Sequence, residues 1–376
     1  MSFEKLGLNS NLLDALTAFG YKKPYPIQKE LIPFVLDGKD VLGIAKTGSG
    51  KTASFVLPLI NNLQGKTKTE NRHINVLVLV PTRELAVQVQ DVFFQFGKDM
   101  PDRIKSLAVY GGVSINPQMQ NLQNVNVLVA TPGRLLELVE SNALKLSTIS
   151  ALVLDEADKM LNLGFKEEMD RIFGLLPKMR QNLLFSATLS PEIEALKSVT
   201  LNDPKIVKIE SEEQDIELIE QTGYFVTDNK KGPLLRHIIK SKNLKQVLVF
   251  TSSIYKADNV ADKLRKNGIN AQAIHGKKGQ MKRLNNLADF KDGKLKVLVA
   301  TDLLARGIDI AFLPCVINYE LPRSPKDFVH RIGRTGRAEN PGMAITFVSP
   351  EEQHHFKVIQ KKMKKIVTMI ESENIL

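Results

Sequence analysis

The chain has 376 residues, of which 43% are hydrophobic and 25% are charged, and its formal net charge is +11. This composition is typical of a soluble globular protein long enough for two domains, and it excludes collagen-like and extensively disordered chains. The single cysteine, Cys315, excludes an internal disulfide and a cysteine-based zinc cluster, which favours a reducing compartment. Apolar runs such as 76–80 are far shorter than the roughly 20 residues that span a bilayer. We therefore expect a soluble cytoplasmic protein with no membrane segment.

The positive charge is concentrated in the second half of the chain. Residues 1–205 carry 23 Lys and Arg against 21 Asp and Glu, a balance of +2, whereas residues 206–376 carry 29 against 20, a balance of +9. Such a surface attracts polyanions, so RNA, DNA and an anionic membrane are all candidate partners, and the charge could also serve solubility alone. Charge does not choose among these alternatives.

Short runs rich in valine, isoleucine and leucine recur along the chain, separated by longer segments typical of helices. Runs of this length without polar alternation predict strands buried on both faces, and helices between them predict parallel βαβ units. The expected strands are 41–45, 76–80, 107–110, 127–130, 151–154 and 183–185 in the first half, and 247–250, 271–274, 297–300, 316–318 and 344–348 in the second. The expected fold class is α/β, with mostly parallel sheets flanked by helices.

One stretch of sequence occurs twice. Val-Leu-Val-Ala-Thr stands at 127–131 and again, letter for letter, at 297–301. The repeat favours two similar α/β domains, each with a strand that delivers a threonine to the sheet edge where such folds bind ligands. An acidic run near 210–220 interrupts the pattern and suggests a linker. We expect a first domain at 1–205, a linker at 206–218, a second domain at 219–350 facing the first across a cleft, and a C-terminal helical extension at 351–376.

A glycine-rich loop follows the first expected strand and precedes a helical stretch. It reads Ala45-Lys46-Thr47-Gly48-Ser49-Gly50-Lys51-Thr52, a P-loop with alanine rather than glycine at its first position. Glycines allow consecutive backbone N–H groups to point at phosphate oxygens at a helix N-terminus. Lys51 would reach the β- and γ-phosphates, and the Thr52 hydroxyl would hold Mg²⁺. The loop predicts binding of a nucleoside triphosphate.

A carboxylate site for the metal follows the strand expected at 151–154. That strand ends in Asp155-Glu156-Ala157-Asp158. Asp155 can hold Mg²⁺ through water, and Glu156 can polarise the attacking water. An acidic turn that opens a helix would look the same in isolation, because carboxylates are favourable at helix N-termini. Its place about 100 residues after a P-loop favours the catalytic interpretation.

These blocks, in this order, resemble the DEAD-box ATP-dependent RNA helicases of superfamily 2, over residues 3 to about 350. The resemblance implies two tandem RecA-like domains, ATP and Mg²⁺ as cofactors, RNA as partner, and ATP hydrolysis that locally unwinds short RNA duplexes or remodels RNA–protein complexes. Residues 20–28 resemble the family's Q motif, which implies that Gln28 reads the adenine edge and Tyr21 stacks on its face. Tyr25 departs from the family, which usually has threonine there.

The resemblance also implies which residues contact RNA. Backbone amides, hydroxyls and guanidinium groups at strand ends are suited to phosphate contacts. The implied residues are Pro81, Thr82, Arg83, Gly111, Gly112, Thr131, Pro132, Gly133 and Arg134 in the first domain, and Thr251, Gly276, Gln280, Arg283 and Thr301 in the second. Lys277 and Lys278 stand where the family often has an acidic residue and methionine, which makes this surface more basic.

The remaining blocks are implied to couple the two ligands. Ser186 and Thr188 resemble the motif that links hydrolysis to strand separation and are expected to bond to Asp158. The resemblance implies that Asp309 contacts the ribose, and that Arg334 and Arg337 reach across the cleft to the γ-phosphate, with His330 among the coupling residues. The spacing of three predicts both arginines on one side of a helical turn. Such arginine fingers raise rates by ~10³–10⁵.

Two other functions stay open at this point. A superfamily 2 DNA translocase would share the ATP site, although the Q motif and the acidic tetrad count against it. An ATP-gated RNA clamp would bind RNA without unwinding it, although the intact Lys51, Glu156 and both arginines favour an enzyme. The lysine-rich segment 361–365 is as consistent with a solvated face as with an accessory RNA contact. We expect a monomer.

Overall fold

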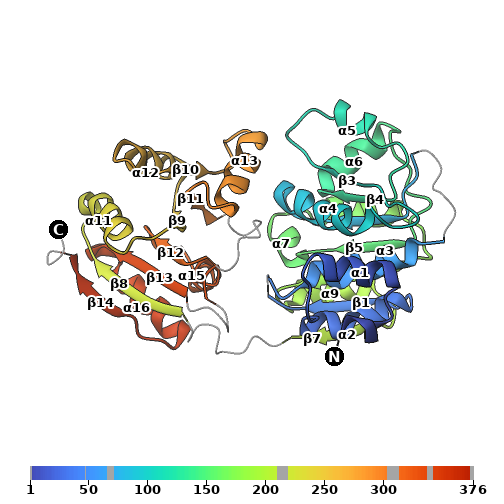
Figure 1. Ribbon diagram of the computed structural model, residues 1–376, viewed down its shortest axis with the longest axis horizontal. Helices are drawn as coiled ribbons and strands as arrows, with labels where there is room; N and C mark the ends of the chain where they lie inside the picture. The colour runs from blue at the N-terminus through green and yellow to red at the C-terminus, as the bar shows by residue number, and fades with distance from the viewer. Residues whose placement is uncertain are drawn as a thin grey trace. The chain divides into compact units, whose positions relative to one another are not determined.

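The chain divides into two compact units, Met1–Ser211 and Glu212–Leu376. The computed structural model describes residues 2–46, 48–65, 72–209, 219–302, 313–336 and 342–372 (Figure 1). Within these ranges no helix has both the length and the apolar character that a membrane crossing requires.

Seven parallel strands form the sheet of the first unit. They are β1 (Val41–Ile44), β2 (Val76–Leu79), β3 (Ser106–Val109), β4 (Val127–Ala130), β5 (Ala151–Leu154), β6 (Gln181–Ser186) and β7 (Lys205–Lys208). Their order across the sheet is β3-β4-β2-β5-β6-β1-β7, and every neighbouring pair is parallel. The strands therefore all end at one edge of the sheet, which we call its carboxyl edge.

Alternate residues of each central strand enter two separate cores, one on each face of this sheet. Val76 and Val78 of β2 pack in one core, whereas Leu77 and Leu79 pack in the other. Burial on both faces explains why the strands read as continuous apolar runs. The first core lies under a 3₁₀-helix, η1 (Phe3–Leu6), and helices α1 (Ser10–Ala18), α2 (Pro26–Leu36), α3 (Lys51–Leu63) and α4 (Arg83–Gly97); the second lies under α5 (Asn116–Gln120), α6 (Pro132–Glu140), α7 (Ala157–Asn162), α8 (Lys166–Leu175) and α9 (Pro191–Thr200).

The second unit repeats the topology of the first. Its strands are β8 (Ile219–Phe225), β9 (Val247–Thr251), β10 (Ala271–Ile274), β11 (Val297–Thr301), β12 (Cys315–Asn318), β13 (Gly342–Val348) and β14 (Thr368–Glu371). Their order, β10-β11-β9-β12-β13-β8-β14, equals that of the first sheet once seven is subtracted from each number. The repeated pentapeptide lies at β4 and β11, which occupy the same place in the two sheets. The prediction of two similar α/β domains is confirmed.

Helices also cover both faces of the second sheet. Val247 and Val249 of β9 pack in one core and Leu248 and Phe250 in another. The helices of this unit are α11 (Asp228–Ser241), α12 (Ile254–Lys266), α13 (Gln280–Lys291), α15 (Pro325–Ile332) and α16 (Gln353–Met363), with a 3₁₀-helix, η2 (Pro350–Glu352), before the last (Figure 1). Buried side chains of α11 and α12 share the first core, and those of α13 share the second.

All of the expected strands form, and the structure adds β7, β8 and β14. Strands β7 and β14 stand at the ends of their sheets, and much of each is exposed, so neither needs a continuous apolar run. Strand β8 is interrupted by polar residues and Gly223. As a result the first sheet continues to Lys208, inside the segment expected as linker, and the segment 351–376 contributes a strand as well as a helix.

Candidate active site

The loops at the carboxyl edge of the first sheet separate the predicted ATP residues from the predicted RNA residues. Strands β5, β6 and β1 are neighbours and lead into 155–158, 186–188 and 45–52. Strands β3, β4 and β2 are neighbours and lead into 111–112, 131–134 and 81–83. Parallel α/β sheets bind their ligands at this edge. Each predicted set therefore gathers on its own half of one edge.

The P-loop holds Lys51 at the first position of α3. Gly48 and Gly50 take φ values of 80° and 88°, which glycine adopts without steric cost. The Lys51 side chain is 7% exposed, and its Nζ donates to the Ala45 carbonyl. Burial lowers the pKa of Lys51, while the nearby Asp155 and Glu156 act in the opposite direction. A phosphate group at this helix N-terminus would favour the charged ammonium. Thr47 lies outside the described residues.

Asp155 and Glu156 follow β5 and differ in what surrounds them. Asp155 is 2% exposed, and burial together with the charge of Glu156 raises the pKa of Asp155 to about 6, although Lys51 acts to lower it. Glu156 has a φ of 54°, in the left-handed region that is strained for a residue with a side chain. Its Oε1 lies 2.7 Å from Lys159 Nζ. Its Oε2 is buried with no hydrogen-bond partner in the described ranges, so it is positioned to accept from a water.

These donors suit Mg²⁺ that arrives with a triphosphate. Mg²⁺ is usually held by one or two carboxylates together with phosphates and water. In the part of the chain that the structure describes, no three His, Cys, Asp or Glu side chains converge into a metal site of their own. Ser49 Oγ is buried without a hydrogen-bond partner there, as a hydroxyl that awaits a phosphate oxygen would be. The residues present therefore fit Mg²⁺ that arrives with ATP, and Asp155 and Thr52 are the residues that would hold it.

Replacing Asp155 with asparagine should stabilise the ligand-free protein by about 2–3 kcal/mol at pH 8, since one pKa unit corresponds to about 1.4 kcal/mol. The folded-state pKa near 6 lies above the ordinary value of 3.8, so the ionised carboxylate is disfavoured in the fold. The gain should shrink as the pH falls through 6 and vanish below about 4, where both states are protonated. Urea unfolding in EDTA at pH 8 and pH 5 measures it. Asp170→Asn, an exposed change on α8, is the control, and a gain that does not depend on pH would contradict the assignment.

Gln28 ties the Q-motif segment to the P-loop. It is 1% exposed on α2, its Nε2 donates to the Gly50 carbonyl at 3.0 Å, and its Oε1 accepts from the Tyr25 N–H at 2.9 Å. A Cβ at Gly50 would lie 2.5 Å from Gln28 Nε2, so the contact requires glycine. The amide retains one N–H and one lone pair, which the predicted contact with the adenine edge would need. The Tyr21 ring packs edge-on against Phe96, with centroids 5.5 Å apart.

The expected link between the acidic tetrad and residues 186–188 runs through one of the two hydroxyls. Thr188 Oγ1 donates to Asp158 Oδ2 at 3.2 Å. Ser186 Oγ instead donates to the Thr188 carbonyl at 2.8 Å and accepts from the Thr188 N–H at 3.2 Å. Ser186 therefore shapes the turn that presents Thr188 to Asp158.

Two guanidinium groups converge on the glycine turn at 111–113. A Cβ at Gly112 would lie 2.0 Å from Arg83 Nη2, so the Arg83 side chain occupies the space that glycine leaves. Arg134 is 5% exposed; its Nη2 donates to the Val113 carbonyl at 2.8 Å and its Nε to Glu137 at 2.9 Å. Arg134 Nη1 is buried with no partner among the residues described. The turn thus brings together the guanidinium groups of Arg83, at the start of α4, and Arg134, near the start of α6, as the predicted phosphate contacts require.

The second unit places its predicted RNA residues on the equivalent strands. Strands β10, β11 and β9 are neighbours, as β3, β4 and β2 are, and Thr251 and Thr301 are partners in register. Gly276 follows β10, and Gln280 and Arg283 lie in the first turn of α13. Both polar atoms of the Gln280 amide are buried without a hydrogen-bond partner within the described ranges. The structure therefore gathers this set at one half of the second carboxyl edge.

Arg331 was not assigned a role from the sequence, yet it organises this edge. It is 2% exposed, and its Nε and Nη2 donate to Asp302 at 2.5 and 2.8 Å. Its Nη1 donates to the Glu320 carbonyl at 2.7 Å, and its guanidinium lies 4.9 Å from the centre of the Phe250 ring. Asp302 directly follows Thr301, so this bidentate pair fixes the end of β11. The signal available in the sequence was an aspartate two positions after the strand expected at 297–300.

Replacing Asp302 with asparagine should destabilise the second unit by about 3 kcal/mol, because Arg331 would keep a buried charge without its carboxylate. Chemical unfolding of the full chain, followed by a probe in the second unit, measures the loss. Asp292→Asn is the matched control, since its pair with Lys294 is largely exposed and should change stability by less than about 1 kcal/mol. Equal effects of the two changes would contradict a structural role for Asp302.

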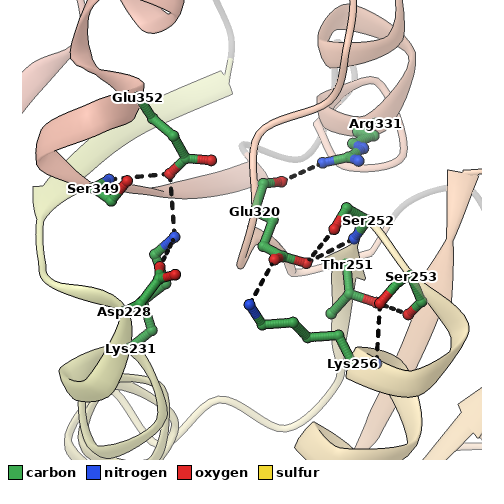
Figure 2. Close-up of polar contacts among 10 residues, drawn as sticks. All are labelled: Asp228, Lys231, Thr251, Ser252, Ser253, Lys256, Glu320, Arg331, Ser349 and Glu352. Atoms are coloured by element: carbon green, nitrogen blue, oxygen red, sulfur yellow. Dashed lines mark hydrogen bonds and ion pairs between the residues drawn. The ribbon is translucent and has the colours of Figure 1, made fainter.

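Figure 2 shows Ser252 and Lys256 converging on the Glu320 carboxylate, after β12. Ser252 N–H and Oγ both donate to Glu320 Oε2 at 2.8 Å, and Lys256 Nζ lies 2.9 Å from Oε1. Although burial acts to raise it, the bonds from Ser252 and Lys256 hold the pKa of Glu320 below its usual value. Glu320 thus fixes the loop that follows Thr251. An acidic residue two positions after the strand expected at 316–318 was the signal for it.

In the second unit, Val226 and Thr227 alone connect the first strand to the first helix, where the first unit has the P-loop. There β8 leads into α11, and Lys231 is 2% exposed. Its Nζ lies 2.8 Å from Asp228 and 3.1 Å from Glu352 (Figure 2). Two carboxylates therefore neutralise this buried lysine in the first turn of α11. This arrangement leaves the first unit as the one suited to a triphosphate.

The predicted arginine fingers were expected on a helical turn, and this is wrong for Arg334. Helix α15 ends at Ile332, and Arg334 lies in the turn after Gly333. The Leu313 N–H donates to the Arg334 carbonyl at 3.1 Å, and Thr335 bridges to Leu313, so this pairing draws the chain out of the helix. Arg334 is 8% exposed, and His330 lies on α15. Arg337 and Asp309 lie outside the described residues.

Two sheets of identical strand order, the first with a P-loop and an acidic strand end, define an ATPase built from tandem RecA-like units. Residues 25–196 match the family described as DEAD/DEAH box helicase, and residues 230–339 match the helicase conserved C-terminal domain. The chain belongs to the DEAD-box ATP-dependent RNA helicases.

Similar proteins come from bacteria, an archaeon and a yeast. The chain is 42% identical to the ATP-dependent RNA helicase CshA of Limosilactobacillus reuteri, over 96% of this chain and 72% of the relative, and 43% identical to CshA of Streptococcus pneumoniae, over 97% and 69%. Among solved structures, S. cerevisiae Dbp5 bound to RNA and ADP BeF3 is 30% identical, covers 99% of this chain and is itself covered over 96%, with a TM-score of 0.84. A DEAD box protein from Methanococcus jannaschii is 38% identical, with coverages of 98% and 99% and a TM-score of 0.55.

Proposed function

We propose that this helicase hydrolyses ATP with Mg²⁺ in an RNA-stimulated manner and unwinds short RNA duplexes locally or remodels RNA–protein complexes. The observation that supports this most is where the RNA residues lie. In each unit they follow the second, third and fourth strands, which are neighbours in the sheet. The predicted phosphate and metal residues of the ATP site follow the first, fifth and sixth strands of the first unit. RNA is then held by two equivalent edges, of which one also holds the nucleotide.

The chemistry follows from the contacts at the first edge. The P-loop amides and Lys51 hold the phosphates, and the burial of Lys51 strengthens that attraction by excluding water. Asp155 and Thr52 would hold Mg²⁺, which neutralises charge between the β- and γ-phosphates when bound. Glu156, with Oε1 held by Lys159 and Oε2 without a partner in the described ranges, orients the attacking water.

Coupling follows from the division of the machinery between the units. Lys51 belongs to the first unit and Arg334 to the second, so both act on one γ-phosphate only when the units come together. RNA residues also come from both units. Because ATP and RNA favour the same closed state, each should raise the affinity for the other. Bending the RNA by closure costs on the order of 1.4 kcal/mol per lost stacking step, by analogy with DNA. A single closure then suffices to melt a short duplex.

Strand displacement distinguishes this enzyme from an ATP-gated clamp. A short RNA duplex with a single-stranded overhang is incubated with the protein and either ATP or a non-hydrolysable analogue. We expect release of the short strand with repeated turnover in ATP and far less with the analogue. A clamp would hold RNA in both and release no strand in an ATP-dependent way.

A second comparison distinguishes the enzyme from a DNA translocase. ATPase rates are measured with single-stranded RNA and DNA of equal length and sequence. We expect stimulation by RNA and little by DNA, and equal stimulation would favour the translocase.

A further inference from the structure

The second sheet carries a concentration of positive charge at the edge opposite its carboxyl edge. Residues 240–246, 262–270 and 289–296, which contain the turns before β9, β10 and β11, hold nine Lys and Arg against three Asp. Six of these cations we call the basic edge: Lys240, Lys242, Lys245, Lys266, Lys291 and Lys296. All are exposed except Lys296, which is partly buried.

The three turns form one continuous surface. The Asn270 side chain donates to the Lys294 carbonyl at 2.8 Å, which joins the turn before β10 to the turn before β11. The Val247 N–H donates to the Lys296 carbonyl at 2.9 Å, which joins β9 to that same turn. Strands β10, β11 and β9 are neighbours in the sheet (Figure 1), so the turns that carry the lysines are adjacent.

Nearby carboxylates do not neutralise the basic edge. Asp262 pairs with Arg265, and Asp292 pairs with Lys294 at 2.9 Å. Asp289 acts on Lys294 as well, and together with Asp292 it raises the pKa of Lys294. Within the described ranges, the acidic residues of these turns are thus directed at cations outside the basic edge.

Solubility and helix ends explain only part of this charge. The three segments have a net charge of +6 (nine minus three), whereas the rest of residues 206–376 has +3 (20 minus 17). A solubilising charge would be spread over the surface rather than gathered here. Cations in the last turn of a helix favour the macrodipole, but Lys242, Lys245 and Lys296 lie beyond the helix ends.

We propose that the basic edge is a second RNA-binding surface, which holds the phosphate backbone of RNA that extends beyond the core site. The surface has cations and amides but, among its described residues, no exposed large hydrophobic side chain. Binding to a membrane surface usually adds such side chains to the positive charge, so RNA is the favoured polyanion. Phosphate contacts carry no base information, so binding here is independent of sequence.

The location sets the length of RNA required. Strand β9 has five residues, so the two edges of the sheet lie about 16 Å apart at ~3.3 Å per residue. An RNA just long enough for the carboxyl edge does not reach the basic edge, whereas a longer one does. The inference rests on the proposed function, since RNA at the carboxyl edge brings the rest of the polymer close.

The test changes one lysine in each turn, Lys242→Gln, Lys266→Gln and Lys291→Gln together. Affinities for RNAs of about 10 and about 30 nucleotides are measured by fluorescence anisotropy with an ATP analogue at several salt concentrations. We expect the long RNA to bind about tenfold more weakly and its salt slope to fall by ~2, from ~0.7 per lost phosphate contact. Affinity for the short RNA, and ATPase stimulated by it, should stay as in the unchanged protein.

A control with the same change in charge is Lys145→Gln, Lys166→Gln and Lys178→Gln, all exposed in the first unit. In this control variant, the long RNA should bind as tightly as it binds to the unchanged protein. An unchanged affinity for long RNA in the basic-edge variant, or an equal loss in the control, overturns the proposal. The proposal is also overturned if the basic-edge variant loses binding to phosphatidylglycerol vesicles but still binds the long RNA as the unchanged protein does. That result would assign the basic edge to a membrane. Failure of short RNA to stimulate the unchanged protein would instead count against the proposed function.

Discussion

Replacing Lys51 with alanine is expected to reduce ATP turnover by at least about 10²–10³-fold, the effect of removing one preorganised donor from a developing charge. The ammonium is 7% exposed and rests on the Ala45 carbonyl of the P-loop, so it is already positioned where the phosphates bind. Steady-state ATPase assays with saturating RNA measure the loss. Binding of a fluorescent ATP analogue should weaken as well, since the same ammonium holds the ground-state phosphates.

Lys46→Ala is the matched control, because it removes an equal charge from the same loop. Lys46 is exposed, and the loop holds phosphate through backbone N–H groups at this position. Its turnover should stay within a few-fold of the unchanged protein. Comparable losses in both variants would mean that loop charge, rather than the placement of Lys51, carries the effect.

Replacing Arg334 with alanine should leave ATP binding to the first unit unchanged and remove most RNA-stimulated hydrolysis, by ~10³-fold or more. Arg334 belongs to the second unit, whereas the P-loop and the acidic tetrad belong to the first. In the proposed mechanism, its guanidinium contributes only once both ligands have brought the units together. Binding of a fluorescent ATP analogue and ATPase assays with and without RNA separate the two effects.

The Arg334→Lys variant distinguishes a loss of ATPase activity caused by the missing phosphate contact from one caused by a change in structure. The lysine keeps the charge but lacks the planar fork that contacts two phosphate oxygens, so only a small part of the rate should return. Thermal unfolding of both variants reports whether the turn paired with Leu313 survives. A near wild-type ATPase rate in a folded Arg334→Ala protein would refute the assignment.

The sequence was sufficient for the fold where strands are buried on both faces. Runs such as Val76–Leu79 are apolar throughout because each side chain enters one of two cores. Strand β7 was not predicted because it lies at the end of its sheet, where only Val207 is buried, so it has no continuous apolar run. The repeated pentapeptide indicated two similar domains. The strand order that the two seven-stranded sheets share could not be predicted, because it depends on which strands pair and no local sequence pattern shows this.

Residue types at strand ends were sufficient to predict which residues gather at the carboxyl edges of the sheets, but the supporting contacts were not predictable. Nothing in the spacing of Arg331, Asp302 and Glu320 shows that they meet, because they come from three separate segments that only the sheet order brings together. For Arg334, in contrast, a pattern in the sequence was misleading. Its spacing from Arg337 was interpreted as helical, whereas pairing with Leu313 ends the helix first.

Solution X-ray scattering tests the central claim, that ATP and RNA together bring the two units into one closed state. The radius of gyration is measured for the free protein, with an ATP analogue, with RNA, and with both. The account predicts a clear decrease with both ligands and a smaller change, or none, with either alone, because the two ligands bind cooperatively to that state. An unchanged radius of gyration in all four samples would contradict it.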